Sequence, residues 1–271
     1  MSVVLMYHAL YRDNDTSLID DEDLPYAVSE SNFIAQLDSL ISRRVGVFDG
    51  STEPEIVITF DDGHLSNLEL AVPLLVERQM PAIFFVTTNF IGKRVGFMDS
   101  EQLKTLSETS GMYVGSHGLS HRFFDDMSPA ESIHELAHSR KLLETLTSRP
   151  CQSISFPGGR YNNETLSQLQ AAGYQQWFGS SVALVNTNVF GSSRVDNENM
   201  NTDFLLPQQN REPLSRVAVR RNTTLDEFSR IIGPDKGYYR QHRLKSQAKR
   251  SLRRIIGNRL YHGLYKSISA R

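Results

Sequence analysis

Short apolar, β-branched runs alternate with longer helical patterns along most of this chain, and this alternation limits the fold more than any other feature. The runs predict strands at residues 3–7, 56–60, 82–86, 113–115, 154–156, 177–180 and 217–219. Helical patterns lie between them, at 68–76 and 166–172 for example, and Ser128-Pro129-Ala130-Glu131 opens a long helix with a capping box. Such alternation favours a parallel sheet with crossover helices. About seven units in about 230 residues predict an α/β fold, a closed or deformed (β/α) barrel rather than an open sheet.

The composition is ordinary for one large globular domain, with 271 residues of which 39% are hydrophobic and 22% charged. The sequence contains no run of 18 apolar residues, and residues 1–10 show neither a basic leader nor a long apolar stretch. The single Cys151 cannot form an internal disulfide, which agrees with a reducing compartment. We therefore expect a cytoplasmic protein.

Charge divides the chain into two parts. Residues 240–271 contain ten Lys or Arg and no Asp or Glu, which leaves 19 basic against 31 acidic residues, a net charge of −12, for residues 1–239. Apolar residues recur at helical spacing from Leu244 to Ile256. The tail is expected to be a basic amphipathic helix, which either packs on the domain or, slightly favoured, lies on an anionic membrane. An acidic body and a tail without a reading motif argue against nucleic acid as a partner.

Two strings carry side chains that suit a divalent metal. Thr59-Phe60-Asp61-Asp62-Gly63 follows one expected strand, and Ser116-His117-Gly118-Leu119-Ser120-His121 follows another. Active groups in parallel α/β folds gather at the carboxyl ends of strands, so the strings should meet there. Asp62, His117 and His121 form a three-ligand set of the kind catalytic zinc uses, with the histidines expected on one side of a helical turn. Each string alone also fits a common turn or ordinary surface and core histidines.

The second aspartate of the first string is free for proton transfer. If the chain is still extended there, Asp61 and Asp62 point in different directions, so one can ligate while the other reaches a metal-bound water. This pairing is sufficient for attack on an amide or ester carbonyl. The alternative is that one aspartate only caps the following helix.

The same strings, together with Ser155-Phe156-Pro157-Gly158-Gly159-Arg160-Tyr161-Asn162, resemble the NodB-homology polysaccharide deacetylases over about residues 3–232. The resemblance implies a deformed (β/α) barrel that removes acetyl groups from glycans. It implies that Asp61 is the general base and that Asp62, His117 and His121 hold the metal. It also implies a substrate-binding groove wall at Pro157, Gly158 and Gly159, with Arg160 and Tyr161 beside it.

The chain departs from this family at several positions. Gly118 stands where Ser or Thr is usual, and Ser155 stands where many members have an Arg that orients the base, for which Arg160 is a candidate replacement. No Leu-x-His string lies near the C-terminus to supply the general acid. His8, at the end of the first expected strand, is the proposed general acid because first and last strands are neighbours in a barrel. The alternative is a core histidine satisfied by hydrogen bonds.

These features predict a metal-dependent deacetylase of an N-acetylated polysaccharide or its lipid-linked precursor, working in the cytoplasm, at the inner face of the membrane if the tail docks there. The expected cofactor is one divalent ion, zinc first, with iron, cobalt or nickel as alternatives. Two other functions stay open: hydrolysis of small-molecule amides or O-acetyl esters, and carbohydrate binding by a catalytically impaired relative.

Overall fold

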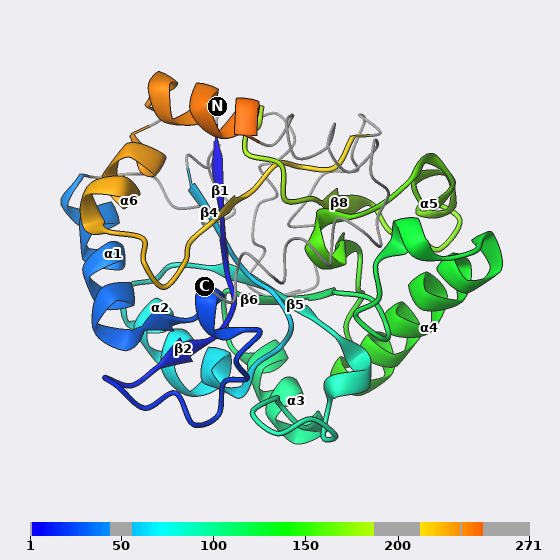
Figure 1. The fold of residues 1–271 in the computed structure, drawn as a ribbon. Helices are drawn as coiled ribbons and strands as arrows, with labels where there is room; N and C mark the ends of the chain where they lie inside the picture. Colours follow the sequence, from blue (N-terminus) through cyan, green and yellow to red (C-terminus); the bar gives the residue numbers. More distant parts are fainter. Residues whose placement is uncertain (1, 44–55, 187–211, 234, 246–271) are drawn as a thin grey trace.

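The computed structural model describes residues 2–43, 56–186, 212–233 and 235–245. Seven parallel strands form one sheet in the order β8-β7-β6-β5-β4-β1-β9 (Figure 1). Their bounds are β1 Val3–Tyr7, β4 Ile56–Phe60, β5 Ala82–Val86, β6 Met112–Ser116, β7 Ser153–Ser155, β8 Gln176–Phe178 and β9 Val217–Ala218. The expected parallel α/β sheet is confirmed, strand by strand.

The segment around β9 joins the two edges of this sheet. β9 pairs with β1, where Leu5 lies opposite Val217 and Met6 opposite Ala218. Just before β9, Leu214 donates its amide to the Trp177 carbonyl at 2.9 Å and accepts from the Gly179 amide at 2.9 Å. The sheet is therefore a curled half-barrel, the deformed barrel that was predicted, and the first and last strands are neighbours as expected.

Alternate residues of each strand enter two separate cores, because successive side chains of a strand point to opposite faces. The smaller core lies inside the curl and includes Val4, Val57, Ile83, Phe85 and Phe178. The larger core lies between the sheet and the helices and includes the intervening residues, among them Val3, Leu5, Ile56, Ile58 and Phe84. Strands buried on both faces explain why the sequence reads as continuous apolar runs there.

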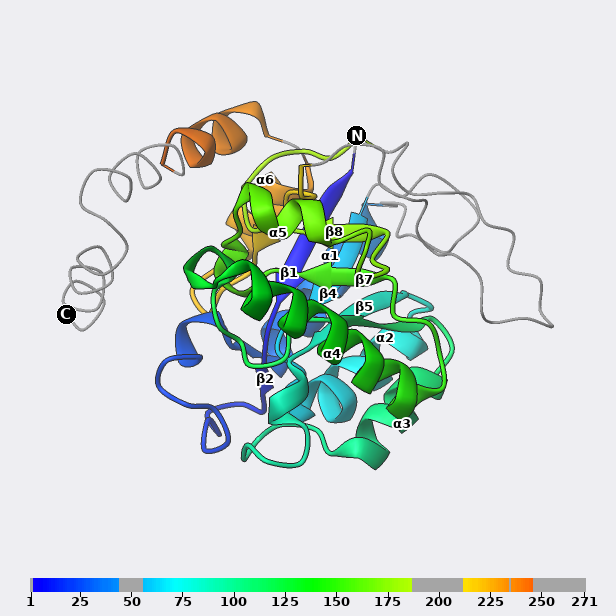
Figure 2. The same cartoon turned by 90° about the vertical axis from the view of Figure 1, so that its right-hand side faces the viewer.

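Helices surround the outside of the sheet (Figures 1 and 2). They are α1 Glu30–Ser42, α2 Val72–Glu77, α3 Ser100–Glu108, α4 Pro129–Thr147, α5 Asn163–Gln168 and α6 Leu225–Ile232. The capping box at the start of α4 is confirmed, since the Ser128 side chain accepts from the Glu131 amide. The helix expected at 166–172 instead begins at Asn163, because Asn162 caps it by accepting from the Thr165 amide.

The remaining elements are short. A second sheet pairs β2 Leu10–Tyr11 with β3 Val28–Ser29. Single turns of 3-10 helix are η1 Leu24–Tyr26, η3 Thr88–Phe90, η4 Phe124–Asp126 and η5 Pro157–Gly159, and η2 Asn67–Ala71 is a π-helical turn. β2, η1 and β3 belong to the acidic segment between β1 and α1, which leaves the same end of β1 that bears His8.

The start of the basic tail is attached to the domain. Residues 236–245 are helical and run across position 240, and both Tyr238 and Tyr239 are buried. The Tyr239 hydroxyl donates to the Ile231 carbonyl at 3.0 Å. Residues 246–271 lie outside the described residues, so the amphipathic helix expected there, and the domain boundary at 239/240, stay predictions.

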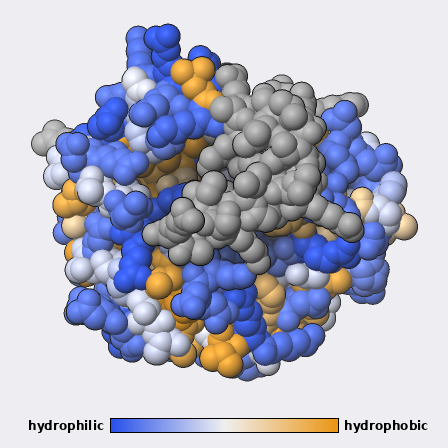
Figure 3. All heavy atoms as spheres, in the orientation of Figure 1, coloured by the Kyte–Doolittle hydropathy of each residue, from blue (hydrophilic) through white to orange (hydrophobic). Residues whose placement is uncertain are grey.

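The described part of the face drawn in Figure 3 is largely polar. Figure 3 shows hydrophilic residues over most of one face, with hydrophobic residues in separate groups. Within the described ranges, no helix has both the length and the apolar character needed to cross a bilayer.

Candidate metal centre

Asp61 and Asp62 follow β4, and both carboxylates lie near His117 Nε2, at 4.0 Å and 3.3 Å. Asp61 continues the alternation of Val57 and Thr59, and only 2% of it is exposed. At Asp62 the backbone turns into the left-handed region with φ of +78°, a conformation that costs energy for a non-glycine residue. The backbone is therefore not extended at Asp62, as the expected difference in direction had assumed. The strain lies where a ligand would be held.

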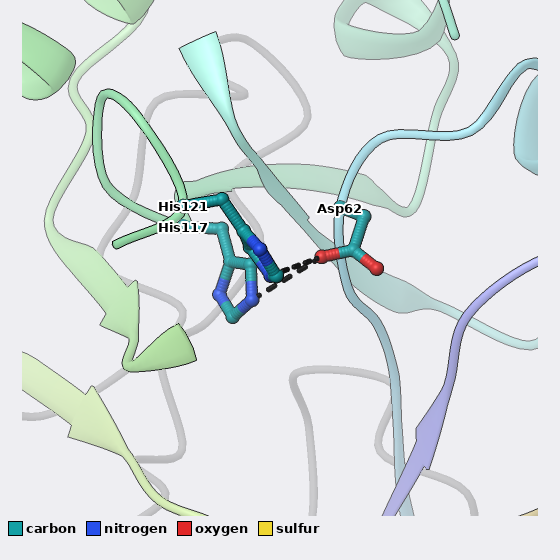
Figure 4. A group of neighbouring side chains, drawn as sticks. All are labelled: Asp62, His117 and His121. Carbon is teal, nitrogen blue, oxygen red and sulfur yellow. Dashed lines mark ion pairs between the residues drawn. The ribbon is translucent and has the colours of Figure 1, made fainter. Parts of the chain in front are cut away.

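His117 and His121 face Asp62 from the loop that follows β6 (Figure 4). The Nε2 atoms of His117 and His121 lie 3.3 Å and 3.1 Å from Asp62 Oδ1. One ligand atom from each of the three residues lies within 4.8 Å of the others. The expected helical turn is wrong, because residues 117–123 form an irregular loop with positive φ at Gly118 and His121. The loop, and not a helical turn, brings the two imidazoles together.

The donor set fits a cation. His117 Nδ1 lies 2.8 Å from the Ser155 carbonyl oxygen, which only accepts, so in the neutral ring Nδ1 carries the proton and Nε2 carries a lone pair. Burial lowers the pKa of His117 to about 4, although the neighbouring aspartates oppose this. The Nε2 lone pair of His117 therefore faces Asp62 Oδ1. Asp62 Oδ1 is buried and has no hydrogen-bond partner of acceptable geometry within the described part of the chain. A divalent ion between these atoms would satisfy them all.

The charges of the site favour an ionised carboxylate and a proton on His121. Burial raises the pKa of Asp62, but the close imidazole of His121, together with the charges of His8 and His117, brings it well below its usual range. Burial lowers the pKa of His121, but Asp62 outweighs it and leaves this pKa raised. A metal ion bound here would replace the proton on His121, which makes binding compete with acid.

Asp61 is held by an arginine that sequence reasoning missed. Arg216 Nη1 and Nη2 each lie 2.7 Å from one carboxylate oxygen of Asp61, and Nη2 donates to Ser155 Oγ at 2.6 Å. Arg216 is 1% exposed, and its Nε donates to the Gly179 carbonyl at 2.8 Å. Burial raises the pKa of Asp61, but Arg216 and His117 leave it below its usual range. Asp61 is thus an ionised, fixed carboxylate, with Oδ2 4.0 Å from His117 Nε2.

The alternative that Arg160 orients Asp61 is wrong. Arg160 instead binds Asp125, with Nε donating to Oδ2 at 3.0 Å, and Asp126, whose Oδ1 lies 2.8 Å from Nη2. Its guanidinium also lies over the Phe123 ring at 4.2 Å. No local signal identified Arg216, because 155 positions separate it from Asp61 in the chain.

His8 lies at the end of β1, beside the carboxyl end of β4, where the Asp61 amide donates to the Tyr7 carbonyl at 2.9 Å. Its positive form would lower the pKa of both Asp61 and Asp62, which places His8 within electrostatic range of the site. Its Nδ1 is buried and has no hydrogen-bond partner among the described residues. The ring packs against Tyr26 at 4.9 Å. The alternative, a core histidine whose ring nitrogens are satisfied by hydrogen bonds, therefore does not hold for Nδ1.

The third motif forms a tight turn next to the metal ligands. η5 follows β7, whose Ser155 carbonyl binds His117. Gly158 and Gly159 have φ of +60° and +62°, and a Cβ on Gly159 would lie 2.0 Å from Ser180 Oγ. The Tyr161 ring packs against Phe156 at 5.2 Å. The substrate-binding role of Pro157, Gly158, Gly159, Arg160 and Tyr161 stays a prediction.

Comparison with known proteins agrees with this geometry. The sequence pattern of the family described as polysaccharide deacetylase matches residues 49–177, which include the three ligands and Asp61. Over residues 49–177 the chain belongs to the polysaccharide deacetylase family. The Bacillus subtilis (strain 168) protein YxkH, whose name describes it as a polysaccharide deacetylase, is 35% identical over 127 residues. That alignment spans 46% of this chain and 44% of YxkH, less than half of either protein.

Solved structures share the fold at low sequence identity. The Streptococcus pyogenes deacetylase PplD, in complex with acetate, is 18% identical with a TM-score of 0.64, over 85% of this chain and 97% of that one. A de-N-acetylase from Aggregatibacter actinomycetemcomitans is 14% identical with a TM-score of 0.67, over 85% and 99% of the two chains. A polysaccharide deacetylase from Bacillus cereus is 20% identical with a TM-score of 0.66, over 85% and 68%.

The small side chain at position 155 contacts both Asp61 and the arginine that comes from another element. Ser155 Oγ donates to Asp61 Oδ2 at 3.2 Å and accepts from Arg216. A guanidinium therefore lies beside Asp61 even though β7 does not supply it.

The first prediction concerns metal affinity. Asp62→Asn removes the negative ligand that both histidines face, so we expect binding of Zn²⁺ or Co²⁺ to weaken at least tenfold. Chelator competition measures this, and binding to the unchanged chain should also weaken as pH falls, because a proton competes for His121. The exposed Asp38→Asn is the control. Equal affinity in Asp62→Asn and the unchanged chain would contradict the ligand assignment.

The second prediction concerns the buried ion pair. Arg216→Gln leaves Asp61 buried without its cation, so the free energy of unfolding at pH 7 should fall by about 3–5 kcal/mol in urea titrations. In the unchanged chain the pKa of Asp61 is lowered on folding, so its stabilising effect is present above the unfolded pKa of about 3.9 and is lost below it. The difference between the two proteins should therefore shrink as the pH falls below about 4. A loss that is independent of pH, or unaltered by adding Asp61→Asn, would contradict this account.

Proposed function

We propose that this protein is a metal-dependent deacetylase that hydrolyses N-acetyl groups of an N-acetylated polysaccharide or of its lipid-linked precursor. The observation that carries the proposal is the convergence of Asp62, His117 and His121 beside a separate ionised carboxylate, Asp61. Family membership supports the reaction class, because an acetylated polysaccharide is the substrate that the family implies.

Asp61 is the proton acceptor in this proposal. A bound divalent ion would supply Lewis-acid chemistry and lower the pKa of a water that it binds. Arg216 and Ser155 fix the Asp61 carboxylate, and its lowered pKa keeps it ionised at neutral pH. Asp61 can therefore take a proton from water that attacks the acetamide carbonyl, while its paired arginine prevents it from turning toward the metal ligands.

His8 is the proton donor to the leaving nitrogen in this proposal. It enters the site from β1, whereas Asp61 enters from β4 and the imidazole ligands from the loop after β6. The His8 ring is partly exposed, and no hydrogen bond at Nδ1 within the described part of the chain commits it to a role in the core. The η5 turn is the proposed substrate wall, and in it Gly158 is exposed and has a positive φ.

Zinc is the proposed ion, since two imidazoles and one carboxylate suit it, and iron, cobalt and nickel suit the same set. A carbohydrate-binding protein with impaired catalysis is less well supported. Position 155 is a serine and cannot supply a guanidinium to Asp61, but Arg216 does. Hydrolysis of small-molecule amides or O-acetyl esters remains the alternative substrate class.

The third prediction is acetate release from a panel of N-acetylated oligosaccharides by the zinc-loaded protein. Asp61→Asn should lower kcat/KM roughly 100- to 10,000-fold, and His8→Ala should lower kcat by a similar factor, because each removes a proton-transfer group. Asp38→Asn should change neither. Near-normal turnover of His8→Ala alongside an inactive Asp61→Asn would place the general acid elsewhere, and turnover of monomers alone would favour the small-molecule alternative.

We also propose that the basic tail docks the protein on the anionic inner face of the cytoplasmic membrane. Ten basic residues and no acidic residue in 240–271 support this, at about 1 kcal/mol for each basic residue near such a surface. The start of the tail is fixed to the domain by Tyr238 and Tyr239, so docking would hold the domain close to the surface.

The fourth prediction tests this docking. The full chain should co-sediment with vesicles that contain anionic lipid, and a chain that ends at Lys245 should not, because the buried tyrosines stay while seven of the ten basic residues are removed. Neutral vesicles are the control. Equal sedimentation of both chains would overturn the docking proposal without affecting the deacetylase proposal.

A further inference from the structure

Glu135 is a buried carboxylate next to the metal-binding loop. It lies on α4, on the side that packs toward the sheet, and only 6% of it is exposed. Within the described ranges no Lys, Arg or His forms a salt bridge with it, although burying an uncompensated charge is costly. The groups that stabilise this carboxylate therefore have to be hydrogen-bond donors.

Those donors all come from the loop that carries the two histidine ligands. Glu135 Oε2 accepts from the Leu119 amide at 2.8 Å and from the Ser120 amide at 3.0 Å. Glu135 Oε1 accepts from the Ser120 hydroxyl at 2.5 Å. Successive backbone N–H groups form a concave anion-binding site, and here an internal carboxylate occupies it.

Glu135 completes the hydrogen bonding of four consecutive loop amides. The His117 amide donates to the Val86 carbonyl at 2.9 Å, and the Gly118 amide donates to Ser116 Oγ at 3.1 Å. Glu135 takes the next two. The backbone between the two ligands is thus bound at every amide from 117 to 120, before the chain turns at His121 with φ of +61°.

Gly118 permits the close approach of this carboxylate. Its φ is +79°, and a Cβ there would lie 3.4 Å from Glu135 Oε2. Position 118 is therefore left-handed, which disfavours a side chain whatever the space around it. The charge-assisted bonds from Glu135 hold the loop in this conformation.

We propose that Glu135 is a positioning residue for the metal centre, which holds the loop between His117 and His121 in the shape that brings both imidazoles to Asp62. The inference rests on the proposed metal-dependent function. Groups that orient metal ligands from outside the ligand set change metal affinity about 10- to 100-fold when removed. Glu135 is not one of the three ligand residues, so in this proposal it acts only through the loop.

The fifth prediction compares Glu135→Gln with Glu131→Gln. In Glu135→Gln one neutral carbonyl oxygen has to accept from both loop amides, and the side-chain NH2 group faces the Ser120 hydroxyl, so the charge-assisted bonds are lost and the Zn²⁺ affinity should fall about 10- to 100-fold in chelator competition. Glu131 lies one turn earlier on α4, is exposed and caps the helix through Ser128, so Glu131→Gln should lower stability without changing the affinity. Ser120→Ala keeps both amide bonds and should give a smaller loss.

Two additions separate the outcomes. All proteins carry His134→Ala and His138→Ala, because these exposed histidines are four residues apart with ring centroids at 3.8 Å and could bind zinc themselves. Urea titration of each metal-free protein gives its free energy of unfolding, so that a loss of affinity can be told from a loss of stability. The positioning role alone would be overturned by unchanged Zn²⁺ affinity in Glu135→Gln. It would also be overturned if both glutamate variants lost affinity in proportion to their loss of free energy of unfolding. Absence of zinc binding by the background protein would overturn the metal-dependent function as well. If Glu135→Gln does not fold, Ser120→Ala decides: unchanged affinity overturns the proposal and a measurable loss supports it.

Discussion

The buried ion pair between Asp61 and Arg216 is the interaction on which the interior of this protein depends. It joins β4 to the segment between β8 and β9, and that segment also links the two edges of the sheet. The cost of removing both charges from water is offset by two short parallel hydrogen bonds, by Ser155 and by the Gly179 carbonyl. The same pair keeps Asp61 ionised and fixed, so one contact both ties β4 to the closing segment and holds the proposed base.

The metal centre is prepared by groups that are not ligands. The Ser155 carbonyl fixes the tautomer of His117, and Glu135 binds the loop that carries His121. Strained backbone at Asp62 and His121 is tolerated because the surrounding hydrogen bonds determine these conformations. Three strands and one helix contribute to the arrangement, which explains how a site made from loop residues can be rigid.

The carboxyl ends of parallel strands meet at one edge, and this rule accounts for the part of the site that could be predicted from sequence. Asp61, Asp62 and His117 directly follow strands with clear apolar patterns, so their convergence was predictable. The path from His117 to His121 was not predictable, because positive φ at Gly118 and His121 depends on contacts with α4. The helix at 163–168 began earlier than expected because an asparagine cap, a weaker signal than the apolar pattern, determines its first residue.

The sequence by itself determined the seven-stranded parallel sheet, the long capped helix and the three residues that suit a metal, because hydrophobic period, capping residues and ligand chemistry are all local. Only the tertiary structure decided which arginine pairs with Asp61, which carboxylate anchors the histidine loop, and that Arg160 binds Asp125 instead. Arg216 lies 155 positions from Asp61 in the chain. Its role arises only when the sheet curls and brings the buried guanidinium of Arg216 to the buried carboxylate of Asp61. Sequence spacing carries no information about this contact.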